Sequence, residues 1–556
     1  MSNINFLLPF WWSDHVYDDF NRWQETWTTG IEHYKFLWEL NDTVPMDGVL
    51  FSRNDINRSE NKKEQAEEAG GIKDFLRLPD DLILFGDCGA YSYIDQDEPP
   101  YDPLETMEFY ERMQYDQACT VDHLITSANM DDKENRLEIT LSNAETMIEQ
   151  HRDGDYSFDL FGVVQGWDPD SYYRATEELL NMGFDHLAFG GLVRASTKDI
   201  IKILQRCYPL WMNKEDVEIH LFGVARWELF PFMQRYGLNS LDNAYHRSAW
   251  LDEKDNYLLT PENEYTAVRI PISDQYADFA ELPSEERAVF DKIREYSNDE
   301  ASPEEVVDTL ETWERTYAEI EGKESRLEFF EDIRNEYLRT LEDRPWEQCD
   351  CHICEEYGVH VAIFRRNERN MRRGFHNLYR FYKFFNSYLD GTEEPPEKTW
   401  DYAKPKEIEE LNLEEFQEED VLVISSCSKT KKTDDPEVEL PAKEMYQGRL
   451  FNNVRDLCEA VNWDHRIISA KYGLLAPEDI VSSYDEKLKT KDEIEEARPE
   501  VIPELAEILY QYDKVLVVAG KPYREVIEPL MDYRFYILNS AGYPVLCSKV
   551  KGAIPA

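Results

Sequence analysis

Five short apolar segments in the first half of the chain each lead into an amphipathic stretch and end in or beside a small or polar residue. They are DGVLFS (47–52), DLILFGD (81–87), FDLFGVVQG (158–166), HLAFGG (186–191) and EIHLFGV (218–224). Alternation of strand, loop and helix predicts a parallel α/β fold. In a (β/α)8 barrel, polar residues at the carboxyl ends of the strands form the active site. The pattern alone is equally compatible with an open, doubly wound sheet.

The length of 556 residues predicts more than one domain. The first α/β unit gives way to acidic helical sequence, then to a cysteine cluster, and a second α/β unit follows a Pro- and Glu-rich stretch. The expected boundaries are 1–275 for the first unit, 276–395 for the acidic helical segment and metal-binding subdomain, 396–418 for a linker, and 419–556 for a separate C-terminal α/β domain.

The net charge of −55, from 115 acidic and 60 basic residues, restricts the conditions under which the chain folds. Such self-repulsion destabilises a compact state at ordinary salt. At molar salt the Debye length falls to about 3 Å, which removes most of the penalty. Because the acids are spread along the whole chain, we expect a halophilic protein from a haloarchaeal cell or from a virus that infects one.

No apolar run reaches the roughly 18 residues that cross a bilayer. The N-terminal sequence MSNINFLLPFWWSD also lacks the basic start of a secretory signal. The sequence therefore predicts a cytoplasmic protein with no membrane partner.

Three of the nine cysteines, Cys349, Cys351 and Cys354, fall within six residues, whereas the others stand alone. Isolated cysteines argue for a reducing compartment and against a disulfide framework. Clustered thiolates suit Zn²⁺, although redox thiols are an alternative. Three histidines could supply the fourth ligand: His352, His360 and His376.

The spacing Cys-x-Cys-x2-Cys-x21-His, which ends at His376, resembles the zinc subdomain of tRNA-guanine transglycosylases. The resemblance implies that His376, on a helix, is the fourth ligand and that the Zn²⁺ is structural. It also implies that the first unit is a (β/α)8 TIM-type barrel.

Two further segments extend the resemblance to the catalytic carboxylates. Base exchange at a glycosidic bond needs one carboxylate that attacks C1′ and a second group that handles the proton. The segment 85–91 (FGDCGAY) is similar to the family's Asp-Ser-Gly-Gly-Phe and implies Asp87 as the general acid/base. The segment 237–247 (GLNSLDNAYHR) implies Asp242 as the nucleophile, although Asn239 replaces an aspartate of the family and the usual Cys-x-x-Pro-Thr-Arg continuation is absent.

Three strand ends between these carboxylates resemble the family's base-binding segments: TVDH (120–123), GVVQG (162–166) and AFGGL (188–192). The resemblance implies that a carboxylate and an amide read the edge of a guanine-like base and that glycines let the backbone approach it. The implied substrate-binding residues are Asp122, Gln165, Gly190, Gly191 and Leu192.

The variants GDCGA (86–90) and VDHLI (121–125) resemble the DNA-modifying branch of the family, the 7-deazaguanine DNA transglycosylases. That resemblance implies exchange of guanine in DNA for 7-cyano-7-deazaguanine. The target guanine must be flipped out or single-stranded, because a duplex hides the glycosidic bond. The alternatives are the same exchange on tRNA in the archaeosine pathway, a hydrolase that excises the base, and a non-catalytic nucleic-acid-binding relative. A homodimer is compatible with each of these.

The densest basic run follows the cysteine cluster, and we expect it to contact phosphates. Its arginines are Arg365, Arg366, Arg369, Arg372 and Arg373.

The C-terminal unit is similar to a domain of unassigned function and carries lysines in the segments CSKTK (427–431), PAKEMYQG (441–448), SAKYGL (469–474) and AGKPYRE (519–525). They lie near expected strand ends or Gly-containing turns and could bind phosphate. CSKTK lacks the glycine pattern of a P-loop. Both catalysis and a DNA-positioning role remain open for this unit.

Overall fold

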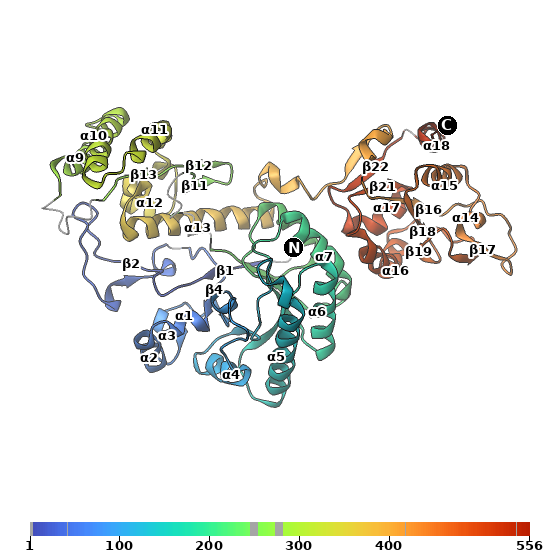
Figure 1. Ribbon diagram of the computed structural model, residues 1–556, viewed down its shortest axis with the longest axis horizontal. Helices are drawn as coiled ribbons and strands as arrows, with labels where there is room; N and C mark the ends of the chain where they lie inside the picture. The colour runs from blue at the N-terminus through green and yellow to red at the C-terminus, as the bar shows by residue number, and fades with distance from the viewer. Residues whose placement is uncertain are drawn as a thin grey trace.

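The computed structural model describes residues 4–41, 43–244, 249, 254–272, 282–417, 419–540 and 542–555. Two α/β units lie side by side along the long axis of the molecule (Figure 1). The first contains a closed barrel and the second an open sheet. The predicted fold class is therefore confirmed, and closure of the barrel excludes an open sheet for the first unit. Among the described helices, none combines the length and apolarity needed to cross a bilayer.

Eight parallel strands form the barrel, in the order β1-β10-β9-β8-β7-β6-β5-β4, with β4 pairing back onto β1. Each of the five strands expected from the sequence is present. The strands are β1 (Asn5–Pro9), β4 (Gly48–Ser52), β5 (Ile83–Asp87), β6 (Gln117–Cys119), β7 (Asp159–Val164), β8 (His186–Phe189), β9 (Glu218–Leu221) and β10 (Ser240–Asp242).

Side chains fill the barrel interior, as in other barrels of this type. Phe85 and Phe161 pack with ring centroids 5.0 Å apart, and Leu7, Cys119 and Ala188 complete the same cluster. All five are at most 1% exposed. The barrel centre is therefore a packed core.

Helices cover the outside of the barrel and begin with local signals that the sequence encodes. In α6, for example, Asp168 accepts from Ser171 N as the N-cap, Pro169 opens the helix, and Gly183 ends it in a left-handed conformation. The helices between the barrel strands are α1 (Arg53–Asn57), α2 (Glu60–Ala69), α3 (Ile72–Leu76), α4 (Pro103–Arg112), α5 (Lys133–Asp153), α6 (Pro169–Met182), α7 (Thr197–Cys207) and α8 (Phe230–Tyr236).

The long helix α13 (Arg366–Asp390) packs against β1 and covers the side of the barrel that α1 to α8 leave open (Figure 1). Phe6 of β1 lies 5.3 Å from Phe381 and 6.4 Å from Phe385, measured between ring centroids. Tyr382 donates to Asp47 Oδ1 at 2.7 Å, just before β4.

A subdomain inserted between β10 and α13 carries the cysteine cluster at one end of the molecule. A hairpin between β1 and β4, formed by β2 (Val16–Tyr17) and β3 (Tyr34–Lys35), also lies against α13. The expected boundary at 275/276 lies outside the described residues. The elements of the subdomain are β11 (Tyr257–Thr260), β12 (Asn263–Tyr265), β13 (Val268–Arg269), α9 (Ser284–Ser297), α10 (Pro303–Glu321), α11 (Ser325–Asp343), α12 (His352–Tyr357) and β14 (Ile363–Phe364).

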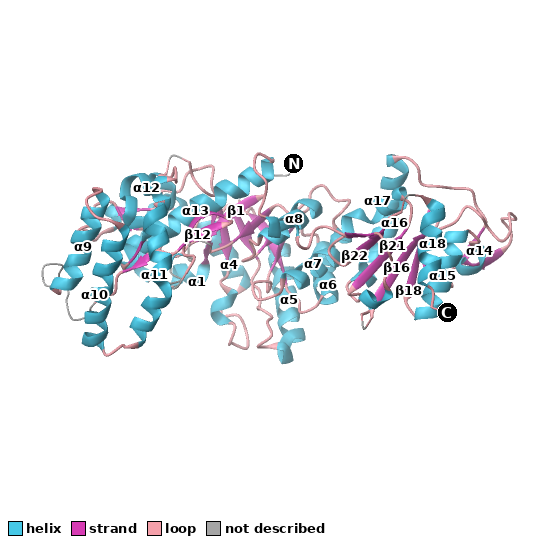
Figure 2. Ribbon diagram, turned by 90° about the horizontal axis from the view of Figure 1, so that it is seen from above, coloured by secondary structure: helices cyan, strands magenta, loops and turns pink. Residues whose placement is uncertain are grey.

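The C-terminal unit is a six-stranded sheet with helices on both faces (Figure 2). Its order is β15-β22-β21-β16-β18-β19, parallel except where β19 pairs with β18. One core packs under α16 and α17, and the other under α15 and α18. The elements are β15 (Lys406–Ile408), β16 (Val421–Ser426), β17 (Glu439–Pro441), α14 (Ala442–Met445), α15 (Arg449–Val461), β18 (Asp464–Ser469), β19 (Gly473–Leu475), β20 (Ile480–Ser482), α16 (Lys491–Leu509), β21 (Lys514–Val518), α17 (Lys521–Ile527), β22 (Phe535–Leu538) and α18 (Tyr543–Ala553).

Part of the expected linker over 396–418 belongs to this sheet, which corrects the expectation. Residues 406–408 form the edge strand β15, and Phe416 is 1% exposed in the C-terminal core. The strand escaped detection because its sequence, Lys-Glu-Ile, is short and charged, as edge strands often are.

The two units meet through buried polar contacts between α7 and the C-terminal domain. Gln205 Nε2 donates to Leu530 O at 2.8 Å and to Asp532 Oδ2 at 3.0 Å. Asp532 also pairs with Arg534 at 2.7 Å, and both are at most 1% exposed. Because these groups are buried, separating the units would expose them to water or leave them without their hydrogen-bond partners.

The arginines of the basic run at the start of α13 do not form an exposed surface. This corrects the expectation that they contact phosphates. Arg365, Arg369, Arg372 and Arg373 are each at most 2% exposed. Glu25 accepts from Arg365 Nε at 2.9 Å and from Arg366 Nε at 2.7 Å, and it also pairs with Arg369. The four buried arginines are held by partners inside the protein and are not available to phosphates. Arg366 is 30% exposed, but its guanidinium is paired with Glu25.

Buried carboxylates and carbonyl oxygens also pair with the other guanidinium groups of the run. Glu286 accepts from Arg365 at 2.7 Å, Glu368 accepts from Arg372, and Arg373 donates to the carbonyl oxygens of Ile363 and Ala249. The sequence shows the density of arginines but not their partners, since Glu25 lies about 340 residues away. The run therefore joins α13 to the N-terminal segment.

Replacement of Glu25 by alanine should lower the free energy of unfolding by about 3–5 kcal/mol, because it leaves buried guanidinium groups without their counter-ion. Burial alone would raise the pKa of Glu25, but the charges of Arg369 and Arg365 lower it from 4.5 to about 2. The stabilisation should therefore be complete above pH 4.5 and disappear as the pH falls through about 2. Denaturant unfolding at several pH values measures both effects. Glu68→Ala, an exposed position on α2, is the control and should change the free energy by less than about 0.5 kcal/mol; an equal effect of both variants would contradict the prediction.

Candidate active site

A cavity of about 940 Å³ opens at the carboxyl ends of the barrel strands. The predicted acids reach it from separate strands: Asp87 ends β5, Asp122 follows β6, and Asp242 ends β10. Gln165 follows β7 and lines the same cavity. The structure thus brings together residues that lie up to 155 positions apart in the sequence.

Asp242 is 6% exposed and is held by one of its two carboxylate oxygens. Oδ1 accepts from the Gly223 N–H at 2.8 Å and lies 3.1 Å from His220 Nε2. His220 Nδ1 is in turn 2.8 Å from Ser240 Oγ. No described residue hydrogen-bonds to Oδ2, so this oxygen has lone pairs available toward the cavity.

Asp87 has a pKa that is far from the ordinary value of an aspartate. Burial raises the pKa of Asp87, the negative charge of Asp122 raises it further, and Asp242 adds to the shift, whereas the Gly89 N–H opposes it. The resulting pKa is about 7. A carboxyl group with this pKa can both give and accept a proton near neutrality.

Asp122 lies deeper, and both of its oxygens have partners. Gln165 Nε2 donates to Oδ2 at 2.6 Å, and Cys88 Sγ donates to Oδ1 at 3.0 Å. Tyr93 OH donates to the backbone oxygen of Asp122 at 3.0 Å. These contacts fix the plane of the carboxylate, as a group that reads the edge of a flat ligand requires.

The predicted glycine pair leaves room for Gln165. A Cβ atom at Gly190 would lie 2.4 Å from Gln165 Nε2. Gly191 has φ +75°, and a Cβ there would lie 3.1 Å from Gln165 Oε1. Leu192, also predicted, is fully buried and lines the cavity. The close approach of this amide therefore favours glycine at 190, and the left-handed backbone conformation favours glycine at 191.

His220 is the main residue of the site that the sequence did not single out. It lies inside β9, is fully buried, and its ring stacks 5.0 Å from Phe85. The sequence feature that could have identified it is a histidine at an inward-facing position of a largely apolar strand. The role of Cys88 was also missed, although its departure from the family motif was evident. Of the segment predicted to hold the nucleophile, Tyr245, His246 and Arg247 lie outside the described residues.

The cysteine cluster and His376 form a second site. Cys349, Cys351 and Cys354 place their sulfur atoms 3.5, 3.5 and 3.3 Å from His376 Nδ1. A tetrahedral Zn²⁺ with bonds of about 2.3 Å to sulfur and about 2.0 Å to nitrogen would separate these ligands by about 3.5 Å. The four residues therefore fit a metal ion of this size and geometry.

The surroundings of the cluster orient the ligands. His376 Nε2 lies 2.8 Å from Leu258 O, which assigns the proton to Nε2 and leaves the Nδ1 lone pair facing the sulfurs. The other two candidate histidines do not join the cluster: His352 is exposed, and His360 Nδ1 accepts from Arg369 at 3.5 Å.

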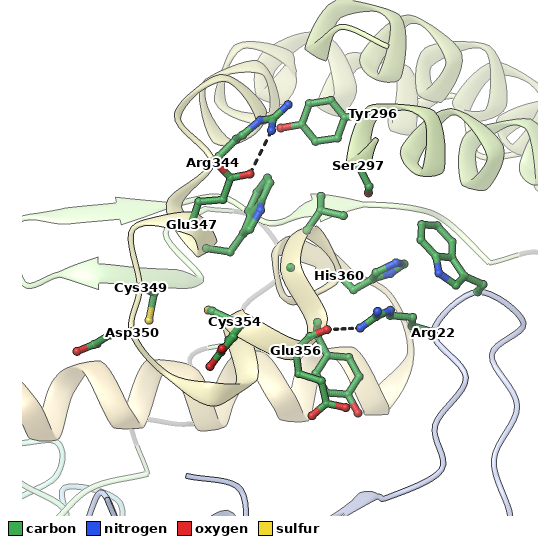
Figure 3. A pocket seen from close by; sticks show the side chains of 16 residues that line it. Arg22, Tyr296, Ser297, Arg344, Glu347, Cys349, Asp350, Cys354, Glu356 and His360 are labelled. Atoms are coloured by element: carbon green, nitrogen blue, oxygen red, sulfur yellow. Dashed lines mark hydrogen bonds and ion pairs between the residues drawn. The ribbon is translucent and has the colours of Figure 1, made fainter. Parts of the chain in front are cut away.

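A separate cavity of about 700 Å³ lies beside the cluster, where Cys349 and Cys354 border it together with Arg22, Tyr296 and His360 (Figure 3). It shares no lining residue with the cavity of the acids. The four residues of the cluster therefore lie apart from the cavity of the carboxylates.

Comparisons with known proteins agree with this architecture. Residues 48–388 match the family model described as queuine tRNA-ribosyltransferase, and residues 421–540 match a family of unknown function. A DNA-guanine transglycosylase of Salmonella montevideo is 34% identical over 367 residues, which cover 61% of this chain and 86% of that relative. A queuine tRNA-ribosyltransferase of Chromohalobacter salexigens is 33% identical over 128 residues, which cover 23% of this chain and 32% of that protein.

The family match spans the barrel from β4 onward, the inserted subdomain and α13, and thus includes the acids and the Cys3His cluster. The chain therefore belongs to the queuine tRNA-ribosyltransferase family and is a transglycosylase.

Proposed function

We propose that this chain exchanges guanine in DNA for 7-cyano-7-deazaguanine through a covalent glycosyl-aspartate intermediate. The observation that carries the proposal is the convergence of Asp87, Asp122 and Asp242 on one cavity, each in a different environment. The DNA-guanine transglycosylase relative, matched over 86% of its length, supports DNA as the acceptor.

In the first half-reaction, a carboxylate oxygen of Asp242 bonds to C1′ of the deoxynucleotide as the bond from C1′ to N9 breaks. The electron pair goes to N9, and Asp87 supplies the proton that neutralises the departing guanine. His220 and the Gly223 N–H hold the other oxygen, so the attacking oxygen stays oriented.

In the second half-reaction, the Asp87 carboxylate takes the N9 proton of the incoming base. N9 then attacks C1′, and the ester to Asp242 breaks. The two halves need Asp87 in opposite protonation states, which a pKa of about 7 makes accessible at neutral pH.

Asp122 and Gln165 are proposed to read the base. A carboxylate accepts well from the N1–H and the exocyclic amine of guanine, and 7-cyano-7-deazaguanine presents the same edge. One pocket can therefore hold first the leaving base and then the incoming base. Gly190 and Gly191 allow the backbone to approach the ring, and Leu192 supports them from the core.

The mouth of the cavity offers contacts for an extruded nucleotide. Tyr91 is 64% exposed and Val193 58% exposed, and both line the cavity together with Arg58 and Arg194. An exposed tyrosine can stack on a base, and the arginines can meet phosphates. This mouth takes the place of the α13 arginines as the proposed nucleic-acid contact.

A second candidate is the same exchange on tRNA, favoured by the 128-residue match to a tRNA-ribosyltransferase. Labelled guanine offered with DNA or with tRNA separates the two, in molar KCl to suit the net charge of −55. Incorporation into tRNA alone would remove the DNA proposal.

Asp242→Asn should abolish the covalent adduct between protein and a guanine-containing DNA strand, because the amide cannot replace the carboxylate as nucleophile. Denaturing gels after incubation with DNA measure the adduct, and guanine exchange should fall by at least about 10³-fold. The control is Asp216→Asn, an exposed carboxyl before β9 at the opposite end of the strand, which should keep both activities. An adduct of wild-type yield in Asp242→Asn would rule out this nucleophile.

The pH dependence should differ between the two half-reactions. Adduct formation needs protonated Asp87, so its single-turnover rate should fall as the pH rises through about 7. Resolution of the adduct by the incoming base needs the carboxylate, so that rate should fall as the pH drops through a lower value, because Asp242 is an uncharged ester in the adduct and no longer raises the pKa of Asp87. Asp87→Asn should remove both inflections and slow exchange by about 10²–10⁴-fold. Inflections that persist unchanged in this variant would assign them to another group.

The metal is proposed to be Zn²⁺, held by Cys349, Cys351, Cys354 and His376. Its contribution is to join the loop of the cluster to α13, with no role in the exchange step. Elemental analysis should find about one zinc per chain, and His376→Ala should lose most of it and lower the melting temperature. His352→Ala, which alters an exposed histidine beside the cluster, should keep both. Full zinc content in His376→Ala would overturn the ligand assignment.

A further inference from the structure

Four lysine-containing segments of the C-terminal domain meet near the carboxyl end of β16, a central strand of its sheet. The loop Cys427–Lys431 follows β16, and Tyr446 of the second segment lies under Lys431, with its ring centroid 4.9 Å from Nζ. Ser469, at the end of β18, is 2.8 Å from Tyr484 OH, and Tyr523 OH is 3.6 Å from Cys427 Sγ. Segments separated by up to about 100 residues thus meet in one place.

β16 is the strand at which the order of the strands in the sheet reverses. The chain leaves β16 for β18 on one side and later returns to β21 on the other side. In open α/β sheets, ligands bind in the crevice outside the carboxyl ends of the strands at such a point. The loop 427–431 leaves the carboxyl end of the central strand and therefore lies in that crevice.

A small cavity of about 130 Å³ occupies the crevice. That volume corresponds to about four water molecules, which suits a compact group such as a phosphate and excludes a whole nucleoside. Its lining residues are Cys427, Ser428, Lys429, Lys431, Tyr484, Asp485, Glu486, Lys487 and Tyr523. It shares none of them with the barrel cavity.

Lys431 is the cation best placed for a ligand. It is partly buried, its ammonium nitrogen lies 4.2 Å from the Tyr484 ring centroid, and it donates to Ser428 O at 2.7 Å. No carboxylate of the described residues lies within 4 Å of it. Asp485, which also lines the cavity, acts on Lys431 only from beyond ion-pair distance. An ammonium group that is partly withdrawn from water and has no direct ion pair favours an anionic ligand.

The tyrosines around Lys431 form a connected support. Tyr446 OH is 3.0 Å from Tyr484 OH, which bonds in turn to Ser469. Gly448 N donates to Ser428 Oγ at 3.0 Å, and a Cβ at Gly448 would lie 2.6 Å from Ser428 Cβ. The loop that carries Lys431 is therefore held from two sides, as a preorganised site requires.

The local charge contrasts with that of the whole chain. Lys429, Lys431 and Lys487 line the cavity of a protein whose net charge is −55. Lys487 is paired with Asp485 at 3.5 Å, which neutralises one of the two lining acids. Lys429 is exposed and has no ion pair among the described residues.

We propose that this cavity is a second ligand site of the chain, which binds the phosphate group of a nucleotide through Lys431 and Lys429, with the nucleoside outside. The phosphate belongs either to a free nucleotide or to a DNA strand, and the chemistry of recognition is the same. The site is independent of base exchange in the barrel.

Titration calorimetry of the full chain tests the proposal with thymidine 5′-monophosphate, thymidine and an oligothymidylate. These probes carry no guanine and so do not fill the base pocket of the barrel. Any binding of the oligonucleotide at the barrel mouth should be unchanged in Lys431→Gln and is thereby told apart from binding at the second site. The wild-type chain should bind the monophosphate or the oligonucleotide, and thymidine at least tenfold more weakly. Lys431→Gln should weaken the phosphate-dependent binding at least tenfold, in line with one lost charge-assisted hydrogen bond.

Lys432→Gln is the matched control, because the adjacent lysine points to solvent and pairs with Glu444 at 2.8 Å. It should bind within twofold of the wild type. Lys429→Gln, at an exposed position, gives a second reading if Lys431→Gln does not fold, and should weaken binding at least threefold.

Preference for the monophosphate identifies a free nucleotide, and preference for the oligonucleotide identifies DNA. Equal binding of thymidine, equal binding by the lysine variants, or no binding of either phosphate probe at millimolar concentration would each overturn the proposal. Guanine exchange by the same preparations reports the barrel separately.

Discussion

Closure of the barrel between its first and last strands is the constraint on which the site depends. β1 pairs with β10 on one side and with β4 on the other, and Leu7 lies opposite Asp242 in that register. This pairing closes the ring, so that the carboxyl ends of β5, β6 and β10 surround one cavity that Asp87, Asp122 and Asp242 line. An open sheet would have placed β10 and β4 at opposite edges. The three acids are therefore neighbours because a short N-terminal strand closes the ring.

Once the acids share a cavity, their mutual repulsion gives them different properties. Asp122 is fixed by Gln165 and Cys88, and Asp242 by His220 and the Gly223 N–H. Asp87 is supported by the Gly89 N–H and by a contact from Cys119 at 3.7 Å, yet burial and the charges of Asp122 and Asp242 raise its pKa to about 7. Differences in burial and hydrogen bonding around chemically identical side chains thus support the different roles proposed for them: proton transfer by Asp87, base recognition by Asp122 and nucleophilic attack by Asp242.

Helix α13 connects the barrel to everything inserted into it. Its aromatic residues cover β1, its arginines pair with Glu25 and Glu286, and its His376 joins the cysteine cluster. In this highly acidic chain the arginines of the run 365–373 are used internally, where an arginine can satisfy several buried carboxylates and carbonyl oxygens at once. The chain as a whole is strongly negative, with a net charge of −55. Lysines or arginines that line a cavity are therefore a stronger indication of an anion-binding site in this protein than in a protein of balanced charge.

The sequence by itself determined the local features whose causes are local. The strands around Phe85, Phe161 and Phe189, the polar residues at their ends, and the Cys-x-Cys-x2-Cys spacing could all be predicted, because periodicity and ligand spacing are written in consecutive residues. The tertiary structure alone decided what depends on distant partners. Examples are the burial of the α13 arginines against Glu25, the placement of His220 beside Asp242, the edge strand at 406–408, and the meeting of four lysine segments around Lys431. Each of these rests on contacts between residues far apart in the chain, and no local pattern encodes which distant charge or ring a side chain will meet.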